Sequence, residues 1–98
     1  MMAKKFQNNK NFLIIEMPWR EYVAITDSWG LCSCCGQYDS EAIFYYVAVI
    51  NDFFCKTCFD AWYSGATHYS VDLQKERQNW NKTVEKLRDV GVWNENRN

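Results

Sequence analysis

The apolar blocks in the first half of the chain predict strands. Residues 12–17 are mostly apolar and stop at Pro18, which lacks the N–H that a strand ladder needs, so they predict one short strand. Residues 43–50 form an apolar run that is rich in β-branched and aromatic side chains on both faces. The turn pair at residues 51–52 follows, and the apolar residues 53–54 begin a return strand, which predicts a β-hairpin.

The apolar spacing changes to the period of a helix in the second half of the chain. A short helix is predicted from Cys58 to the stop at Gly65, with one apolar side made by Phe59, Trp62 and Tyr63. A longer helix is predicted over residues 71–90, just before Gly91. Its repeating face, at spacings of four and three, consists of Leu73, Arg77, Trp80, Val84 and Leu87.

The remaining segments complete one small α+β domain. Residues 19–29 fit a helix that begins after Pro18 or a strand, and the β-rich stretch at residues 22–26 favours extended structure. The polar, lysine- and asparagine-rich N-terminus predicts a mobile tail. The predicted parts are a flexible tail (1–11), an N-terminal strand segment packed on the core (12–30), a cysteine-bearing unit (31–66), a C-terminal amphipathic helix (67–93) and a frayed tail (94–98).

Four of the five cysteines fall into two C-x-x-C pairs. Cys32 and Cys35 form the first pair, Cys55 and Cys58 form the second, and 19 residues separate the pairs. This separation is in the range expected of a four-cysteine zinc site, and four thiolates make the tetrahedral all-sulfur set that Zn²⁺ favours. Four protein ligands leave no position for water, so we expect one structural Zn²⁺ and no hydrolytic centre.

The order of these parts resembles the treble-clef zinc finger, in which a C-x-x-C-G zinc knuckle is followed by a β-hairpin and by a C-x-x-C at the start of a helix. The match runs from Cys32 to about Gly65, roughly a third of the chain. Residues 29–30 (Trp-Gly) and 58–62 (Cys-Phe-x-x-Trp) are similar to a group of small bacterial and phage zinc-finger proteins. The resemblance implies a treble-clef fold and Zn²⁺ on the four cysteines; it implies no activity.

Cys34 and His68 are candidate ligands outside this set. A turn from Cys32 to Cys34 is too tight for a knuckle, so Cys35, followed by Gly36, takes precedence. Cys34 is then either a small filler or an outward-facing reactive thiol. His68, the single histidine, could replace one cysteine, but four thiols already complete the shell, so we expect it to be hydrogen-bonded or to face solvent. An iron–sulfur cluster also takes four thiolates and stays open as an alternative.

Aromatic residues make up 17% of the sequence, more than the core of a 98-residue chain can hide. We expect the excess to line a protein-binding surface, although aromatic packing beneath a loop-rich fold would also account for it. The candidate surface residues are Trp19, Tyr22, Tyr45, Tyr46, Tyr69 and Trp93.

The formal net charge of −1 does not support a nucleic-acid binder that relies on electrostatic attraction. Single-stranded RNA or DNA could still be bound through aromatic stacking, and this is the alternative function. Its candidate phosphate contacts are Lys56, Arg77, Lys82, Lys86 and Arg88.

The sequence contains no catalytic set, so we expect that the protein is not an enzyme. The odd number of cysteines and the lack of a secretory signal pattern favour reduced thiols in the cytoplasm, and residues 43–50 are too short to span a membrane. We therefore expect a zinc-binding, monomeric or homodimeric protein-interaction adaptor or modulator. A phage or mobile-element accessory protein that inhibits a host complex would fit this description.

Overall fold

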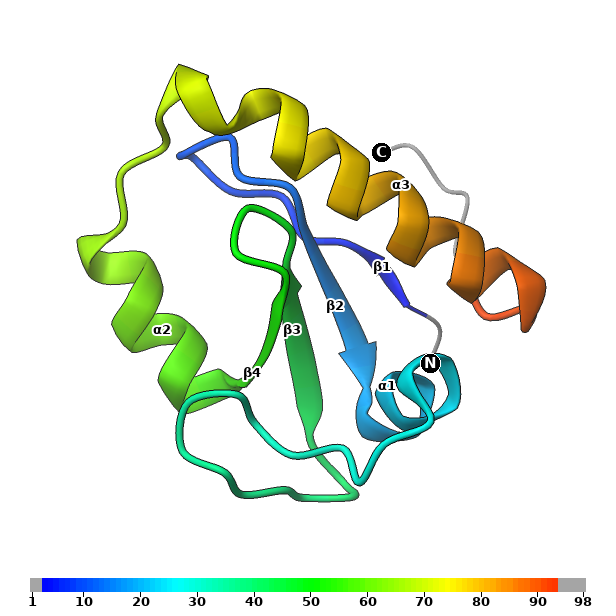
Figure 1. The fold of residues 1–98 in the computed structure, drawn as a ribbon. Coiled ribbons are helices and arrows are strands. Elements are labelled where there is room, and N and C mark those ends of the chain that lie inside the picture. The colour runs from blue at the N-terminus through cyan, green and yellow to red at the C-terminus, as the bar shows by residue number, and fades with distance from the viewer. Residues whose placement is uncertain (1–2, 94–98) are drawn as a thin grey trace.

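A four-stranded antiparallel sheet in the order β1-β2-β3-β4 forms the middle of the protein (Figure 1). This computed structural model describes residues 3–93 of the chain. Its elements are β1 (Lys4–Lys5), β2 (Ile14–Pro18), α1 (Trp19–Thr26), β3 (Ile43–Val47), β4 (Asp52–Cys55), α2 (Lys56–Gly65), a 3-10 helix (Ser70–Asp72) and α3 (Leu73–Asp89). The expected α+β class is confirmed.

The predicted β-hairpin is formed by β3 and β4. β3 ends at Val47, three residues before the end of the apolar run, because the turn occupies residues 48–51. Asn51 has a φ of 56°, a left-handed conformation that asparagine tolerates better than most residues. The register sets Phe44 opposite Cys55, so the hairpin carries Cys55 to the start of α2.

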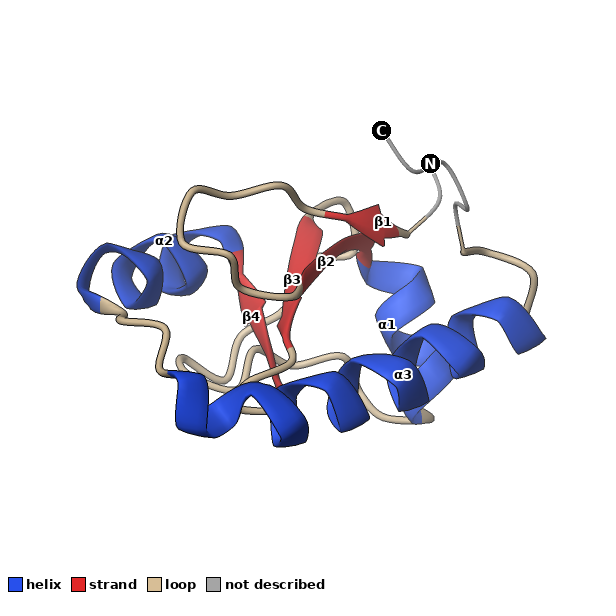
Figure 2. Cartoon of the chain, turned by 90° about the horizontal axis from the view of Figure 1, so that it is seen from above, coloured by secondary structure: helices blue, strands red, loops and turns tan. Residues whose placement is uncertain are grey.

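Helices cover both faces of the sheet, because successive side chains of a strand point to opposite faces. On one face, the ring of Phe53 in β4 stacks on Tyr22 of α1 at 4.1 Å, and Tyr46 donates a hydrogen bond to the Asn79 carbonyl of α3. On the other face, the ring of Tyr45 in β3 stacks on the ring of Phe59 in α2, with 4.5 Å between the ring centroids. Figure 2 shows α3 beside one face of the sheet, and the central strands β2 and β3 bury side chains on both faces.

Residues 19–26 form α1, so the preference for extended structure at this segment was wrong. Pro18 ends β2 and caps the helix in an extended conformation, and the Trp19 N–H donates to the carbonyl of Ala42. Tyr22 and Ile25, three residues apart, are both buried. A helix is favoured here because residues three apart lie on the same face of a helix, so both side chains reach the core. In a strand, residues three apart would point to opposite faces.

The prediction of a mobile tail at residues 1–11 was wrong for the described part of that segment. Lys4 and Lys5 form the edge strand β1, and Lys4 makes an ion pair with Glu16 at 3.4 Å. Lys10 Nζ donates hydrogen bonds to two carbonyls at the end of α2, those of Tyr63 and Ala66. Lysine is common on edge strands and at helix C-termini. The lysines of this segment therefore belong to an edge strand and to the cap of α2. The predicted frayed tail, 94–98, lies outside the described residues.

The predicted C-terminal helix is α3, which covers residues 73–89 after a 3-10 turn. Trp80, Val84 and Leu87 are buried, as their spacing predicts. Leu73 and Arg77 are exposed, and the buried position in the first turns is Glu76. The helix is therefore anchored at its start by a carboxylate instead of an apolar side chain.

Candidate metal centre

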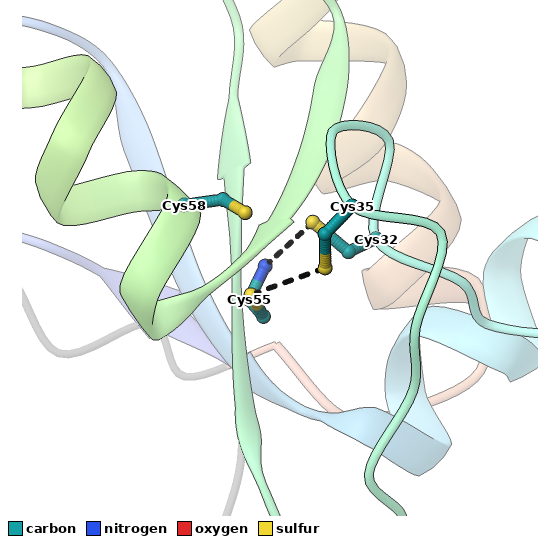
Figure 3. Close-up of side chains that lie close together, drawn as sticks. All are labelled: Cys32, Cys35, Cys55 and Cys58. Carbon is teal, nitrogen blue, oxygen red and sulfur yellow. Dashed lines mark hydrogen bonds between the residues drawn. The ribbon is translucent and has the colours of Figure 1, made fainter.

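The four paired cysteines come together at one end of the β3–β4 hairpin (Figure 3). Their ligand sulfurs all lie within 4.8 Å of one another, and those of Cys35 and Cys55 are 3.9 Å apart. A tetrahedral shell with metal–sulfur bonds of about 2.3 Å separates its sulfurs by about 3.8 Å. The predicted ligands Cys32, Cys35, Cys55 and Cys58 are thus placed to hold a single metal ion.

The first pair sits on a tight turn between α1 and β3. Gly36 has a φ of 73°, and its N–H donates to the carbonyl of Cys32 at 2.9 Å. Glycine adopts this left-handed conformation at no steric cost, so the turn can close directly after Cys35. In addition, the Cys32 N–H donates to the Gln37 carbonyl, which ties the two ends of the turn together.

The second pair lies at the junction of β4 and α2. Cys55 is the last residue of β4 and the N-cap of α2, which begins at Lys56, two residues before the predicted start. Ser33 joins the two pairs: its N–H donates to the Phe53 carbonyl, and its Oγ accepts from the Phe53 N–H. Ser33 was not among the predicted site residues, and its position inside the first C-x-x-C is the one sequence signal that points to it.

Backbone hydrogen bonds lower the pKa of the Cys32 thiol. Burial acts to raise this pKa, but N–H groups of Cys35, Cys55 and Cys34 outweigh it and bring the pKa to about 7. Two of these groups, the N–H of Cys55 and that of Cys34, lie 3.3 and 3.4 Å from the Cys32 sulfur. Because its pKa is depressed, the Cys32 thiol gives up its proton to a metal more readily at neutral pH than the thiols of the second pair.

Metal binding should release protons from the second pair. Desolvation raises the pKa of both the Cys55 and the Cys58 thiols above their ordinary value, and hydrogen bonds to neighbouring sulfurs raise that of Cys58 further. Both thiols therefore keep their protons at neutral pH until a metal displaces them. We expect at least two protons per ion at about pH 7.5, and an affinity that falls about a hundredfold per pH unit of acidification.

Titration calorimetry in two buffers with different ionisation heats counts these protons directly. The metal-binding heats measured in the two buffers should differ by at least twice the difference between the buffer ionisation heats. Release of fewer than one proton per ion would contradict this assignment of the two thiols.

Cys34 and His68 stay outside the four-sulfur cluster. Cys34 is exposed, which does not fit a small filler in the core, and its side chain is close enough to Cys58 to help raise the pKa of that thiol. His68 Nε2 lies 2.8 Å from a carboxylate oxygen of Glu76, and its ring packs on Phe12. The expectation of a hydrogen-bonded histidine is therefore confirmed.

Three of the six candidate surface residues are in the core. Tyr22, Tyr45 and Tyr46 are buried, so their assignment to a partner surface was wrong. The physical reason is that both faces of the sheet are covered, and a tyrosine can be buried where its hydroxyl finds an acceptor, as that of Tyr46 does. Trp19 and Trp93 are half-buried, and Tyr69 is exposed.

The two exposed aromatics nearest to the metal cluster in sequence were not among the candidates. Trp29 is 86% exposed and Tyr38 is 61% exposed. Trp29 lies three residues before Cys32, and Tyr38 lies three residues after Cys35. The Trp-Gly motif was noted for its resemblance to other proteins, but exposure could not be read from it.

Comparison of the chain with protein-family models, with curated proteins and with solved structures gives no significant match. Among the described residues, no helix has the length and apolar character needed to cross a membrane. The assignment of a metal site therefore depends on the geometry of the four sulfurs alone. They come from a turn, a strand end and a helix start, and they are arranged as a closed ligand shell.

Proposed function

We propose that this protein is a non-enzymatic protein-interaction module, built on a treble-clef unit that one structural Zn²⁺ holds together. The observation that carries the proposal is the pair of exposed aromatics, Trp29 and Tyr38, on either side of the metal-binding turn. A metal at this turn fixes the ends of both segments, so the ion's role is to shape the surface that they form.

The donor set supports Zn²⁺ in a structural role. Four cysteine sulfurs within 4.8 Å of one another match an all-thiolate tetrahedral shell, which leaves no position for a substrate or water. The order of the cysteine turn, the β3–β4 hairpin and α2 is the order of parts in a treble clef. An iron–sulfur cluster on the same four thiolates is the alternative that metal analysis must separate.

The exposed aromatics support a protein partner. Large aromatic side chains at a surface bring contact area with few rotatable bonds, and such residues dominate binding energy in interfaces. A nucleic-acid partner is less well supported, since the net charge is −1 and the exposed Lys56 is already paired with Asp60 at 2.7 Å. Trp29 and Tyr38 take the place of the buried tyrosines as contact residues, with half-buried Trp19 beside them.

A photo-crosslinking amino acid placed at position 29 tests this proposal. We expect ultraviolet irradiation in the native host to link position 29 to a defined partner protein, and we expect the purified partner to bind the zinc-loaded protein in isolation. Val71 offers a matched control, because it is also 86% exposed and lies in the 3-10 helix before α3. Substitution at position 71 should give no such crosslink.

Two outcomes would overturn the proposal. Crosslinks from positions 29 and 71 to the same range of abundant proteins would show that neither surface is specific. Crosslinks from position 29 to RNA or DNA, with binding that weakens steeply as salt is raised, would establish the nucleic-acid alternative instead.

A further inference from the structure

A surface pocket of about 380 Å³ lies between α1 and the segments on either side of the metal-binding turn. Its lining residues are Trp19, Val23, Asp27, Ser28, Trp29 and Tyr38. We propose that this pocket binds the positively charged side chain of a lysine or arginine in a partner protein. The inference rests on the proposed interaction function and names the chemistry that the partner must present.

The aromatic walls supply the first part of the recognition. The rings of Trp19 and Tyr38 lie 5.7 Å apart between centroids with an interplanar angle of 30°, and Trp29 adds a third ring at the opening. The face of an aromatic ring attracts a cation within about 6 Å of its centroid, and tryptophan does so most strongly. At this separation Trp19 and Tyr38 contact each other, so together they form one aromatic wall of the hollow. A charged side chain can lie against this wall, with its alkyl stem against Trp29.

Asp27 supplies the selection for positive charge. Its carboxylate lines the pocket, is exposed, and forms no ion pair with any residue in the range 3–93. Asp27 itself has a φ of 51°, and its N–H caps α1 by donating to the Val23 carbonyl at 2.9 Å. Arg20, the nearest cation in sequence, is 3.6 Å from Glu21 and lines a different hollow, so it does not neutralise this carboxylate.

The Trp19 side of the pocket is held in place before any ligand arrives. Trp19 Nε1 donates to the Gly30 carbonyl at 3.0 Å, which fixes the plane of the indole. Gly30 has a φ of 73°, and a Cβ built there would lie only 2.4 Å from Trp19 Nε1, so the backbone approaches the ring as only glycine allows. The Gly30 N–H also donates to Ser28 Oγ, which braces the segment that carries Trp29. Because the Trp19 indole is already fixed, its ordering costs little entropy on binding.

The proposal is tested with short uncharged peptides that carry one central lysine, trimethyllysine or arginine. The matched neutral probe is the tert-butyl isostere of trimethyllysine, which has the same shape without the charge. Binding to the zinc-loaded protein is followed through the indole ¹H–¹⁵N signals of the tryptophans. We expect the cationic peptides to shift the signals of Trp19 and Trp29 with dissociation constants on the order of 1 mM. The neutral isostere should bind about tenfold more weakly.

Surface variants then assign the binding to this pocket. We expect Trp29→Ala to weaken binding of the cationic peptides about tenfold and Asp27→Asn to weaken it about fivefold. The equally exposed Val71→Ala should leave the affinity unchanged. Comparison of the dissociation constants of the three cationic peptides shows whether lysine, trimethyllysine or arginine is the preferred ligand.

The inference is overturned if no cationic peptide at about 10 mM shifts either indole signal, or if the neutral isostere binds as well as its charged counterpart. In both cases, a specific partner crosslinked at position 29 would leave the proposed function intact and restrict the error to the ligand class. Conversely, peptide binding without any crosslinked partner would support the pocket and contradict the wider interaction function.

Discussion

Replacement of Cys32 by serine will remove the metal and the cooperative fold, whereas replacement of Cys34 by serine will leave both unchanged. Cys32 is buried, its sulfur accepts hydrogen bonds from two backbone N–H groups, and it belongs to the four-sulfur cluster. Cys34 is exposed and lies outside that cluster. Binding of a structural Zn²⁺ can contribute on the order of 10 kcal/mol to folding, which is comparable with the whole free energy of unfolding of a small domain.

Thermal unfolding followed by far-ultraviolet circular dichroism, together with the metal content of each variant, measures this difference. The wild-type protein and Cys34→Ser should unfold cooperatively at the same temperature, and Cys32→Ser should show no transition. Retention of metal and of cooperative unfolding by Cys32→Ser would contradict the assigned ligand set.

The second large effect is expected at Glu76, whose replacement by alanine should destabilise the zinc-loaded protein by about 3–5 kcal/mol. Glu76 is only 1% exposed. Its carboxylate accepts a hydrogen bond from the Leu13 N–H at 2.9 Å and bonds to His68 Nε2 at 2.8 Å. It therefore joins α3 to the segment before β2 and to the loop after α2. Alanine would leave the Leu13 N–H and the His68 ring without their buried acceptor.

Urea denaturation at saturating zinc gives the free energy of unfolding for this comparison. Glu85→Ala is the matched control, since Glu85 is exposed on the same helix, and its effect should stay within about 0.5 kcal/mol. Glu76→Gln, which keeps one acceptor oxygen, should fall between the two. An unfolding free energy for Glu76→Ala equal to that of Glu85→Ala would show that the buried hydrogen bonds contribute nothing to stability.

Local features of the sequence were enough to find the four cysteines that come together at the candidate metal centre. The C-x-x-C spacing, Gly36 after the first pair and the helical pattern after Cys55 all act within a few residues, and each works through backbone geometry that the residue itself imposes. The hairpin and α3 were likewise predictable, because a turn pair between apolar runs and a repeat of buried positions are local signals.

The features that the sequence analysis missed depend on contacts between distant segments. Glu76 is buried because its partner Leu13, 63 residues away in the chain, presents an N–H there, and no local pattern marks that contact. β1 exists because β2 offers an edge, although Lys4 and Lys5 have a composition typical of a tail. The sequence likewise could not show that Trp29 is exposed and Tyr46 is buried, because this difference depends on the helices that cover both faces of the sheet.

The most direct test of the account is native mass spectrometry of the untagged protein purified without added metal, combined with a count of reactive thiols. We predict one Zn²⁺ per chain, with the exposed Cys34 alone reactive until a chelator removes the ion and frees the other four thiols. Cys35, Cys55 and Cys58 line a surface hollow, so a chelator can approach the site. Iron and sulfide in place of zinc, or five reactive thiols in a folded metal-free protein, would contradict it.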